Sequence, residues 1–467
     1  MSYEVTGVIA TSVIVLIALW AASLLWAVSD IIKSRNPKKW IPVQVVPLLG
    51  ALLYYLYGHG TEKIKSTGKL RQLIINRWTV VAIIIIIVLS MYVRLVDYRW
   101  PYLRNIDSYV FYRWIDETVQ NNGILPTHDI YELAPVGFYR PPQWIYPYFY
   151  LGAYSYMLVN NFINIQLWEF LIYFPPLLAT LAVIPLYFIG KMLYDRKAGV
   201  LAAFFYIFEV NNLSHTLGGD PDSDAIVILV SMVTMAALIF TYKYATSTKS
   251  LDKKLILYSV LTSIILWIWY STWAGYWYIF WLFSGFIALK VIFTVLKRRN
   301  IKLAWQDTKY ILISFALCMI LSFVLTIPPY GTIKIESALA GPIQFQSIKG
   351  EDTQFPNVYV SVAELQQSGG PKEIIQGTTI VSGPFILISS FFLMLYTLAY
   401  LIYSFYKKKH HVDTVLLLLV WFLGPFMATI VAIRFSTLFS APLAIGAAII
   451  LSKLIRMATG EDKNFSD

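Results

Sequence analysis

The sequence contains long apolar runs that have no polar face. Val80–Ser90 reads VVAIIIIIVLS, and Ala225–Phe240 is apolar around its whole circumference if it is helical. A helix on the surface of a soluble protein keeps a charged face, whereas a helix that is apolar all round is typical of a membrane span. The composition agrees, because 58% of the 467 residues are hydrophobic and only 13% are charged, about half the charged share of soluble domains. The sequence therefore predicts an integral membrane protein and excludes a soluble globular domain.

The apolar runs predict the fold class, an all-α polytopic membrane protein with a bundle of about 12 transmembrane helices. One run, Gly199–Phe208, is too short to span a membrane alone, so a spanning helix there must extend into the neighbouring residues. The expected spans are Val8–Val28, Trp40–Leu56, Thr79–Val96, Leu171–Leu193, Gly199–Phe208, Ala225–Tyr242, Leu255–Tyr270, Tyr276–Leu296, Tyr310–Ile327, Thr379–Phe405, Val415–Val431 and Ser436–Ile455.

Positive charge gives the chain a predicted orientation. The net charge is +11, and the Lys and Arg residues fall in short loops between apolar runs, which favours topology and anionic lipid over nucleic acid as the explanation. If these loops face the cytoplasm, three segments face outward: Asp97–Glu169, Asn211–Asp224 and Pro328–Gly377. The basic loop Lys33 to Lys39 falls on the wrong side in this scheme. The aromatic segment Trp144–Val159 must not cross the membrane, so we expect an interfacial helix there.

The outward segments carry acidic residues that could bind a divalent cation. Asp107 follows the third expected span, Asp222 and Asp224 form a D-x-D pair, and Glu364 lies in the longest outer loop. Hard cations prefer several oxygen ligands, which carboxylates from different loops can supply. An ordinary structural role stays open as the alternative, because D-x-D is short and common. Either aspartate could simply cap the helix beginning near Ala225. A lone aspartate or glutamate is usually solvated, and Arg434 in the last outer turn could be a topology anchor.

Taken in order, these motifs resemble a known family. Ile106–Arg113 (IDSYVFYR) resembles the first acidic motif of the archaeal AglB-type oligosaccharyltransferase catalytic subunit, which is a GT-C glycosyltransferase. Asp222-Ser223-Asp224 resembles its second acidic motif. Further matches follow in the same order, namely Ile184–Ala203 to its second and third spans, Trp273–Tyr276 to a W-x-G-Y turn, Ser361–Glu364 to an S-V-S-E or T-I-x-E motif, and Ile433–Phe435 to an R-F turn. The resemblance runs from about residue 79 to residue 455.

The resemblance implies a role for each matched residue. Asp107, Asp222 and Asp224 would hold Mn²⁺ or Mg²⁺, Glu364 would complete the site and touch the acceptor amide, and Arg434 would contact the pyrophosphate of the lipid-linked donor. The implied reaction moves an oligosaccharide from a dolichyl phosphate or pyrophosphate to an asparagine of an acceptor polypeptide, at the outer face of the cell membrane. Metal and arginine suit this chemistry because the leaving group is an anion.

The predicted domain organisation departs from the family at both ends. Residues 1–78 would form an extra two-helix membrane hairpin with a basic cytoplasmic loop, residues 79–457 the GT-C-like catalytic domain, and residues 458–467 a polar tail. Family members carry a large outer domain with a W-W-D-Y-G motif that reads the acceptor sequon, and this sequence has no such motif. Three explanations stay open: a truncated chain, a separate subunit that recognises the sequon, or another acceptor.

Two other functions compete with N-glycosylation. One is a different GT-C transferase, which would use a monosaccharide lipid phosphate or a lipid acceptor. The other is a non-catalytic or transport membrane protein, although transporters place ionisable residues at the middle of the membrane and are built from repeats. The acidic residues here fall in outer loops, and the sequence shows no clear internal repeat.

Overall fold

The structure is a computed structural model that describes residues 78–99, 101–140, 147–350, 366, 368–378, 383–408 and 411–462. The expected spans Val8–Val28 and Trp40–Leu56 lie outside the described residues, as does the basic loop Lys33 to Lys39. Glu364 and its motif also lie outside them.

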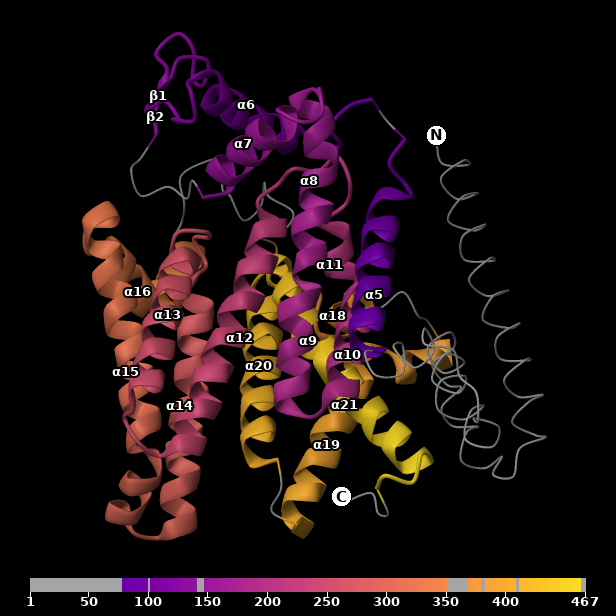
Figure 1. Ribbon diagram of the computed structural model, residues 1–467, viewed down its shortest axis with the longest axis vertical. Coiled ribbons are helices and arrows are strands. Elements are labelled where there is room, and N and C mark those ends of the chain that lie inside the picture. Colours follow the sequence, from indigo (N-terminus) through magenta and orange to yellow (C-terminus); the bar gives the residue numbers. More distant parts are fainter. Residues whose placement is uncertain are drawn as a thin grey trace, which may run out of the picture.

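The described chain is a bundle of long apolar helices (Figure 1). Eight helical segments in the described residues are long and apolar enough to cross a membrane. They are α5 (Trp78–Leu95), α8 (Leu167–Leu181) continued by α9 (Val183–Leu193), α12 (Asp224–Thr248), α13 (Lys253–Tyr270), α14 (Trp277–Arg298), α15 (Ile301–Tyr330), α20 (Val412–Val431), and the 3-10 helix η5 (Ile433–Phe439) continued by α21 (Ser440–Ala458). The predicted helical membrane bundle is thus confirmed, and the count of 12 spans stays a prediction.

Two further helices of the described chain pack in the bundle. α10 (Arg196–Tyr206) covers the expected short span, and α19 (Ser390–Lys408) follows the 3-10 helix η4 (Gly383–Ile388). α10 packs closely on α9 because a Cβ added at Gly190 would lie 2.9 Å from the Cα of Gly199. α21 forms the centre of the bundle, since 89% of its most apolar stretch is buried.

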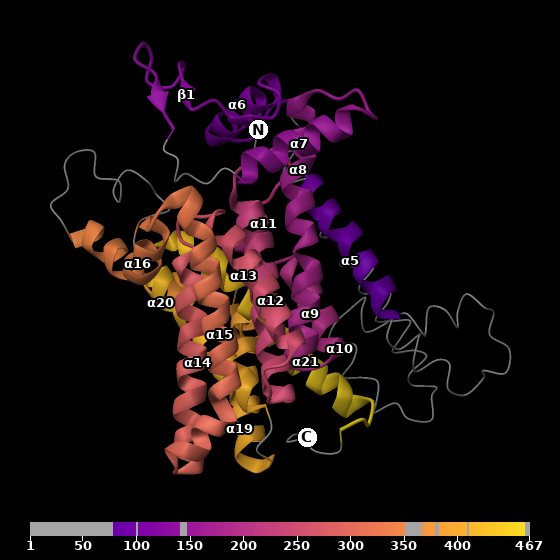
Figure 2. The ribbon, with the colours of Figure 1, turned by 60° about the vertical axis from the view of Figure 1, so that its left-hand side comes forward.

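A small outer layer covers one end of the bundle (Figures 1 and 2). It contains α6 (Ile106–Gln120), α7 (Pro147–Asn160) and a hairpin of two short antiparallel strands, β1 (His128–Asp129) and β2 (Phe138–Tyr139). α7 corresponds to the expected interfacial helix, and its relation to a membrane surface stays a prediction.

Buried ion pairs fasten the hairpin of this outer layer to α6. Arg140 Nη2 lies 2.8 Å from Asp129 Oδ2 and 2.6 Å from Glu117 Oε2. Arg113 Nη2 lies 2.6 Å from the same Asp129 oxygen. Although burial of the carboxylate raises the pKa of Asp129, hydrogen bonds from two backbone N–H groups and the charges of both arginines hold it below its usual value. The outer layer is therefore fixed by charge as well as by apolar packing.

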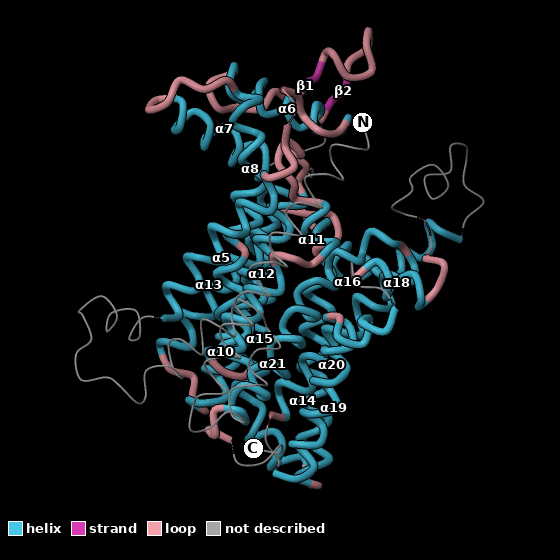
Figure 3. The backbone as a smooth tube through the Cα atoms, turned by 90° about the vertical axis from the view of Figure 1, so that its right-hand side faces the viewer, coloured by secondary structure: helices cyan, strands magenta, loops and turns pink. Residues whose placement is uncertain are grey.

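The longest expected outer loop, Pro328–Gly377, is partly helical. α15 runs on to Tyr330, although Pro328 and Pro329 lie in its last turn. α16 (Ile333–Gly350) and α18 (Pro371–Gly377) follow (Figure 3). The expectation from the sequence was an outer loop over this segment, without a prediction of helices in it, and a Gly- and Pro-rich composition does not exclude them.

Candidate functional site

The aspartate-rich loop connects α11 (Val210–Ser214) to α12 and is fixed by its two glycines. The Gly218 N–H donates to the Arg94 carbonyl at 2.9 Å, and the Gly219 N–H donates to the Ile172 carbonyl at 3.1 Å. Gly219 has a φ of +79°, and a Cβ there would lie 2.5 Å from the ring of Tyr98. Only glycine meets both conditions without strain. The two glycines thereby hold the loop against α5 and α8 by backbone hydrogen bonds.

The start of α6 contacts this loop, although more than 100 residues separate them in the chain. The Ser108 hydroxyl donates to Asp220 Oδ1 at 2.9 Å, and the Arg104 N–H donates to the Gly219 carbonyl at 2.6 Å. Asn105 caps α6 by accepting the N–H of Asp107 at 3.0 Å. Asp107 lies in the first turn of α6 with an exposed side chain. The first two acidic motifs therefore lie next to each other.

Asp222 is the most perturbed carboxyl of the loop. Its Oδ1 accepts hydrogen bonds from the Ser223 N–H at 2.5 Å and from the Ser223 hydroxyl at 3.1 Å. Burial raises the pKa of Asp222 to about 6, the charges of Asp224 and Asp220 add to the rise, and Arg434 opposes it. Helix α12 begins at Asp224 with Ser223 as its N-cap, and no side chain caps it. The N-cap of α12 is therefore neither Asp222 nor Asp224, the two residues that the alternative of an ordinary helix cap named.

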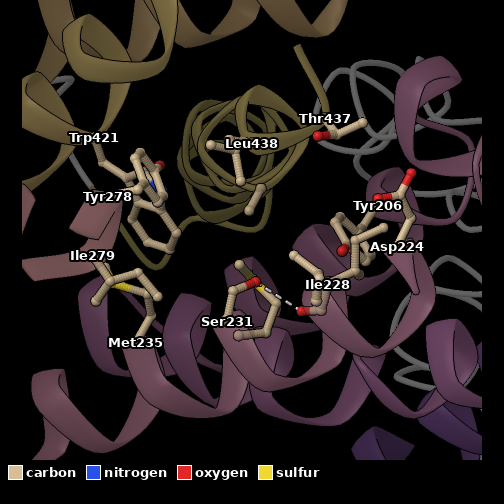
Figure 4. A pocket seen from close by; sticks show the side chains of 13 residues that line it. Tyr206, Asp224, Ile228, Ser231, Met235, Tyr278, Ile279, Trp421, Thr437 and Leu438 are labelled. Atoms are coloured by element: carbon tan, nitrogen blue, oxygen red, sulfur yellow. Dashed lines mark hydrogen bonds between the residues drawn. The ribbon is translucent and has the colours of Figure 1, made fainter. Parts of the chain in front are cut away.

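Asp224 lies between a histidine and an arginine side chain. His215 Nδ1 is 3.0 Å from Asp224 Oδ2, and Arg434 Nη2 is 3.9 Å from Asp224 Oδ1. Arg434 comes from η5, so the last motif of the sequence reaches the second one. A small pocket of about 20 Å³ opens inward from Asp224, with Tyr206 beside it and Tyr278 and Trp421 on the far side (Figure 4). Its volume is that of about one water molecule, so it cannot hold a substrate.

A larger cavity of about 560 Å³ lies beside the aspartate loop. Half of its lining residues are aromatic, and its polar groups include Ser223 of the loop, Arg434 and Glu132. The aromatic residues that line it are Phe111, Trp114, Tyr148 and Phe149 from α6 and α7, together with Trp273, Trp277 and Phe435 from the bundle. Part of the predicted W-x-G-Y turn therefore belongs to the wall of this cavity. Few polar groups in a mostly apolar cleft are typical of a ligand site.

Of the five predicted site residues, the structure brings together Asp222, Asp224 and Arg434. Asp107 precedes Ser108, whose hydroxyl bonds to Asp220 of the same loop, and its own side chain is exposed. Glu364 lies outside the described residues. Among the residues that the structure describes, no group of three His, Cys, Asp or Glu side chains is arranged to hold a metal ion. The donor chemistry nevertheless fits a hard cation, because burial raises the pKa of Asp222 and repulsion from the neighbouring carboxylates raises it further. A bound cation would relieve that repulsion.

Three polar residues of the candidate site were not among the residues predicted from the sequence. Ser108 and His215 gave no signal, since a lone serine or histidine in an outer segment is ordinary. Asp220 belongs to the same acidic run as the D-x-D pair, and its bond to Ser108 ties that run to α6. Burial is the main cause that raises the pKa of Asp220.

Comparisons with known proteins agree with the motif order. The family model "Oligosaccharyl transferase STT3, N-terminal" matches residues 76–460. A relative from Methanocaldococcus jannaschii, named dolichyl-phosphooligosaccharide-protein glycotransferase, is 23% identical over 76% of this chain and 46% of its own length. This chain therefore spans less than half the length of that relative.

Two solved structures of the Archaeoglobus fulgidus oligosaccharyltransferase share the fold. The AglB complex with an inhibitory peptide and a dolichol-phosphate has a TM-score of 0.54 and 17% identity, over 84% of this chain and 52% of that one. The complex with zinc and sulfate has a TM-score of 0.51 and 18% identity, over 81% of this chain and 50% of that one. Because the family model covers most of the sequence, this chain belongs to the STT3 family of oligosaccharyl transferases.

Proposed function

We propose that this chain transfers an oligosaccharide from a dolichyl phosphate or pyrophosphate donor to an asparagine of an acceptor polypeptide. One observation carries the proposal: the aspartate loop, the start of α6 and Arg434 meet beside the aromatic cavity. The relative named as a dolichyl-phosphooligosaccharide-protein glycotransferase supports the donor class. The AglB complex with a peptide and dolichol-phosphate supports both substrates.

In this proposal the carboxylates hold the metal and the acceptor. Asp107, Asp222 and Asp224 would bind Mn²⁺ or Mg²⁺, with Glu364 completing the site from the segment outside the described residues. The zinc complex of a solved relative supports a divalent ion. When bound, the ion would supply positive charge to the anionic leaving group. The carboxylates themselves would accept the N–H hydrogens of the acceptor amide, which weakens its conjugation and strengthens its nitrogen as a nucleophile.

Arg434 would bind the donor phosphate. Its guanidinium comes from η5 to the polar edge of the cavity and lies 3.9 Å from Asp224, so one residue can touch both the carboxylate loop and the donor. A planar guanidinium can hold two phosphate oxygens at once. The aromatic walls suit the apolar faces of sugar rings. The site would lie at the outer face of the plasma membrane, as the charge of the loops predicts.

A transfer assay on the full chain tests the proposal. The purified protein is reconstituted in lipid with a lipid-linked oligosaccharide and a peptide containing N-x-T, with Mn²⁺, Mg²⁺ or EDTA. We expect a glycosylated peptide with either metal and none with EDTA. A glycosylated lipid would instead identify a GT-C transferase with another acceptor. Activity only after addition of a second polypeptide would identify a separate subunit that recognises the sequon. The absence of any transfer under all these conditions would contradict the proposal.

A further inference from the structure

Tyr148 is a buried tyrosine at the second residue of α7, and the mechanism above does not use it. Only 1% of its surface is exposed, and its ring packs on Phe111, Phe149 and Phe174 at centroid distances of 5.6 to 6.0 Å. Its hydroxyl is buried and has no hydrogen-bond partner in the part of the chain that the structure describes. A buried hydroxyl without a partner is costly, and a bound ligand that accepts its hydrogen bond would remove that cost.

Tyr148 belongs to the wall of the large cavity, and its hydroxyl lies close enough to the aspartate loop to interact with the charges of that loop. Tyr148 lines that cavity together with Ser223, the residue between Asp222 and Asp224, and Arg434. Burial raises the pKa of Tyr148 well above its usual value, and the charges of Asp222, Asp220 and Asp224 raise it further. A bound cation would neutralise the carboxylates but would leave the burial unchanged. The phenol therefore stays protonated and is a hydrogen-bond donor.

We propose that the Tyr148 hydroxyl is a further substrate-binding group, which donates a hydrogen bond to a phosphate oxygen of the lipid-linked donor. This inference rests on the proposed function. Arg434 and Tyr148 line the same cavity from different elements, η5 and α7, so a phosphate between them would meet a cationic and a neutral donor.

The chemistry of the reaction favours the phosphate over the acceptor amide as the partner. A hydrogen bond to the amide carbonyl would increase the double-bond character of the C–N bond and weaken the nitrogen as a nucleophile. A hydrogen bond to the phosphate strengthens as the leaving group gains charge. In the transfer, the bond from the anomeric carbon to the phosphate oxygen breaks with both electrons on oxygen. The carbon–nitrogen bond forms, and one amide proton leaves to solvent. Tyr148 keeps its proton throughout.

Tyr148→Phe removes the hydroxyl and keeps the ring. Tyr242→Phe is the matched control, because Tyr242 is also a buried tyrosine and lies 18 residues along α12 from Asp224. At saturating Mn²⁺ we expect kcat for glycosyl transfer to fall roughly 10- to 100-fold in Tyr148→Phe. The KM for the acceptor peptide and the half-saturating Mn²⁺ concentration should not change, and Tyr242→Phe should match the wild type.

A wild-type kcat in Tyr148→Phe would overturn the proposal. So would a loss that extra Mn²⁺ restores, because Tyr148 would then act through the metal site. A binding measurement separates this inference from the proposed function, with labelled dolichyl phosphate as the probe and the full chain in nanodiscs. We expect Tyr148→Phe to weaken binding about tenfold. If the wild type transfers no glycan, the proposed function fails, and equal binding of the probe by wild type and variant would still overturn the role of Tyr148.

Discussion

The imidazole Nδ1 of His215 lies 3.0 Å from Asp224 Oδ2, and Arg434 Nη2 lies 3.9 Å from the other oxygen of the same carboxylate. Asp224 is thus held from two directions, by the segment that follows α11 and by η5. A carboxylate whose two oxygens have different partners cannot rotate freely. The contact with His215 therefore helps to set the orientation of the Asp224 carboxylate toward a metal ion or a substrate.

Replacement of His215 should reduce transfer without unfolding the protein. His215→Ala removes the group that orients Asp224, so we expect activity to fall about tenfold, as for other residues that orient metal ligands. His215→Asn keeps a donor near the position of Nδ1 and should retain more activity. Initial rates at a series of Mn²⁺ concentrations measure both variants. Equal loss in the two variants would show that the imidazole acts otherwise than by orienting Asp224.

The acidic motifs should be essential for activity and dispensable for folding. We expect Asp222→Ala and Glu364→Ala each to abolish transfer while the protein stays folded and inserted in the membrane, because both carboxylates would bind the ion or the acceptor. Transfer assays and size-exclusion profiles of the purified variants test this. Full activity in either variant would refute the assignment of that residue.

The acidity of Asp222 predicts a pH dependence of stability in the metal-free protein. Its pKa is about 6 in the folded protein against a usual value of 3.8. The folded state therefore binds the proton more tightly than the unfolded state, and this carboxyl adds stability below about pH 4 that is lost as the pH rises through about 6. In EDTA, the Tm of the wild type should fall over this range relative to that of Asp222→Asn. If the Tm of the two proteins depends on pH in the same way, the raised pKa of Asp222 is contradicted.

Much of the fold could be predicted from the sequence, because a membrane imposes its pattern on every span. Runs such as Ala225–Tyr242 and Val415–Val431 correspond to α12 and α20 within a few residues. The segment from Pro328 to Gly377 could not be predicted, since α15 continues through two prolines and α16 packs on the bundle. Trp281 Nε1, for example, donates to the Ala338 carbonyl at 2.9 Å. Such tertiary contacts leave no periodic pattern in the sequence.

The site was predictable in part, for a different reason. Motif order made Asp222, Asp224 and Arg434 candidates, because the resemblance depends on local residue patterns, and the structure places the three close together. His215 and Tyr148 could not be found in this way, because their relevance arises only when distant segments meet. The burial of Tyr148 beside the aspartate loop depends on α7 folding back over α8, and no local pattern encodes that.

The position of the aspartate loop also depends on Arg94, a fully buried residue near the outer end of α5. Arg94 Nε donates to Thr216 Oγ1 at 2.9 Å, and its Nη1 donates to Ser90 Oγ at 2.7 Å. Both hydroxyls have other partners, because Thr216 donates to the Asn212 carbonyl at 2.7 Å and Ser90 is 2.8 Å from the Thr180 hydroxyl. Removal of the guanidinium should therefore leave no unpaired hydroxyl and should cost little global stability.

We expect Arg94→Met to loosen the loop specifically. Amide hydrogen exchange in the peptide 216–223 should become faster, and transfer should fall about tenfold, while the Tm changes little. Thr241→Val is the control, because it removes one side of a buried threonine pair, 2.9 Å between hydroxyl oxygens, that joins α12 to α13 away from the site. That variant should lose some stability and leave exchange in the loop unchanged. If loop exchange in Arg94→Met equals that of the wild type, Arg94 does not position the aspartates.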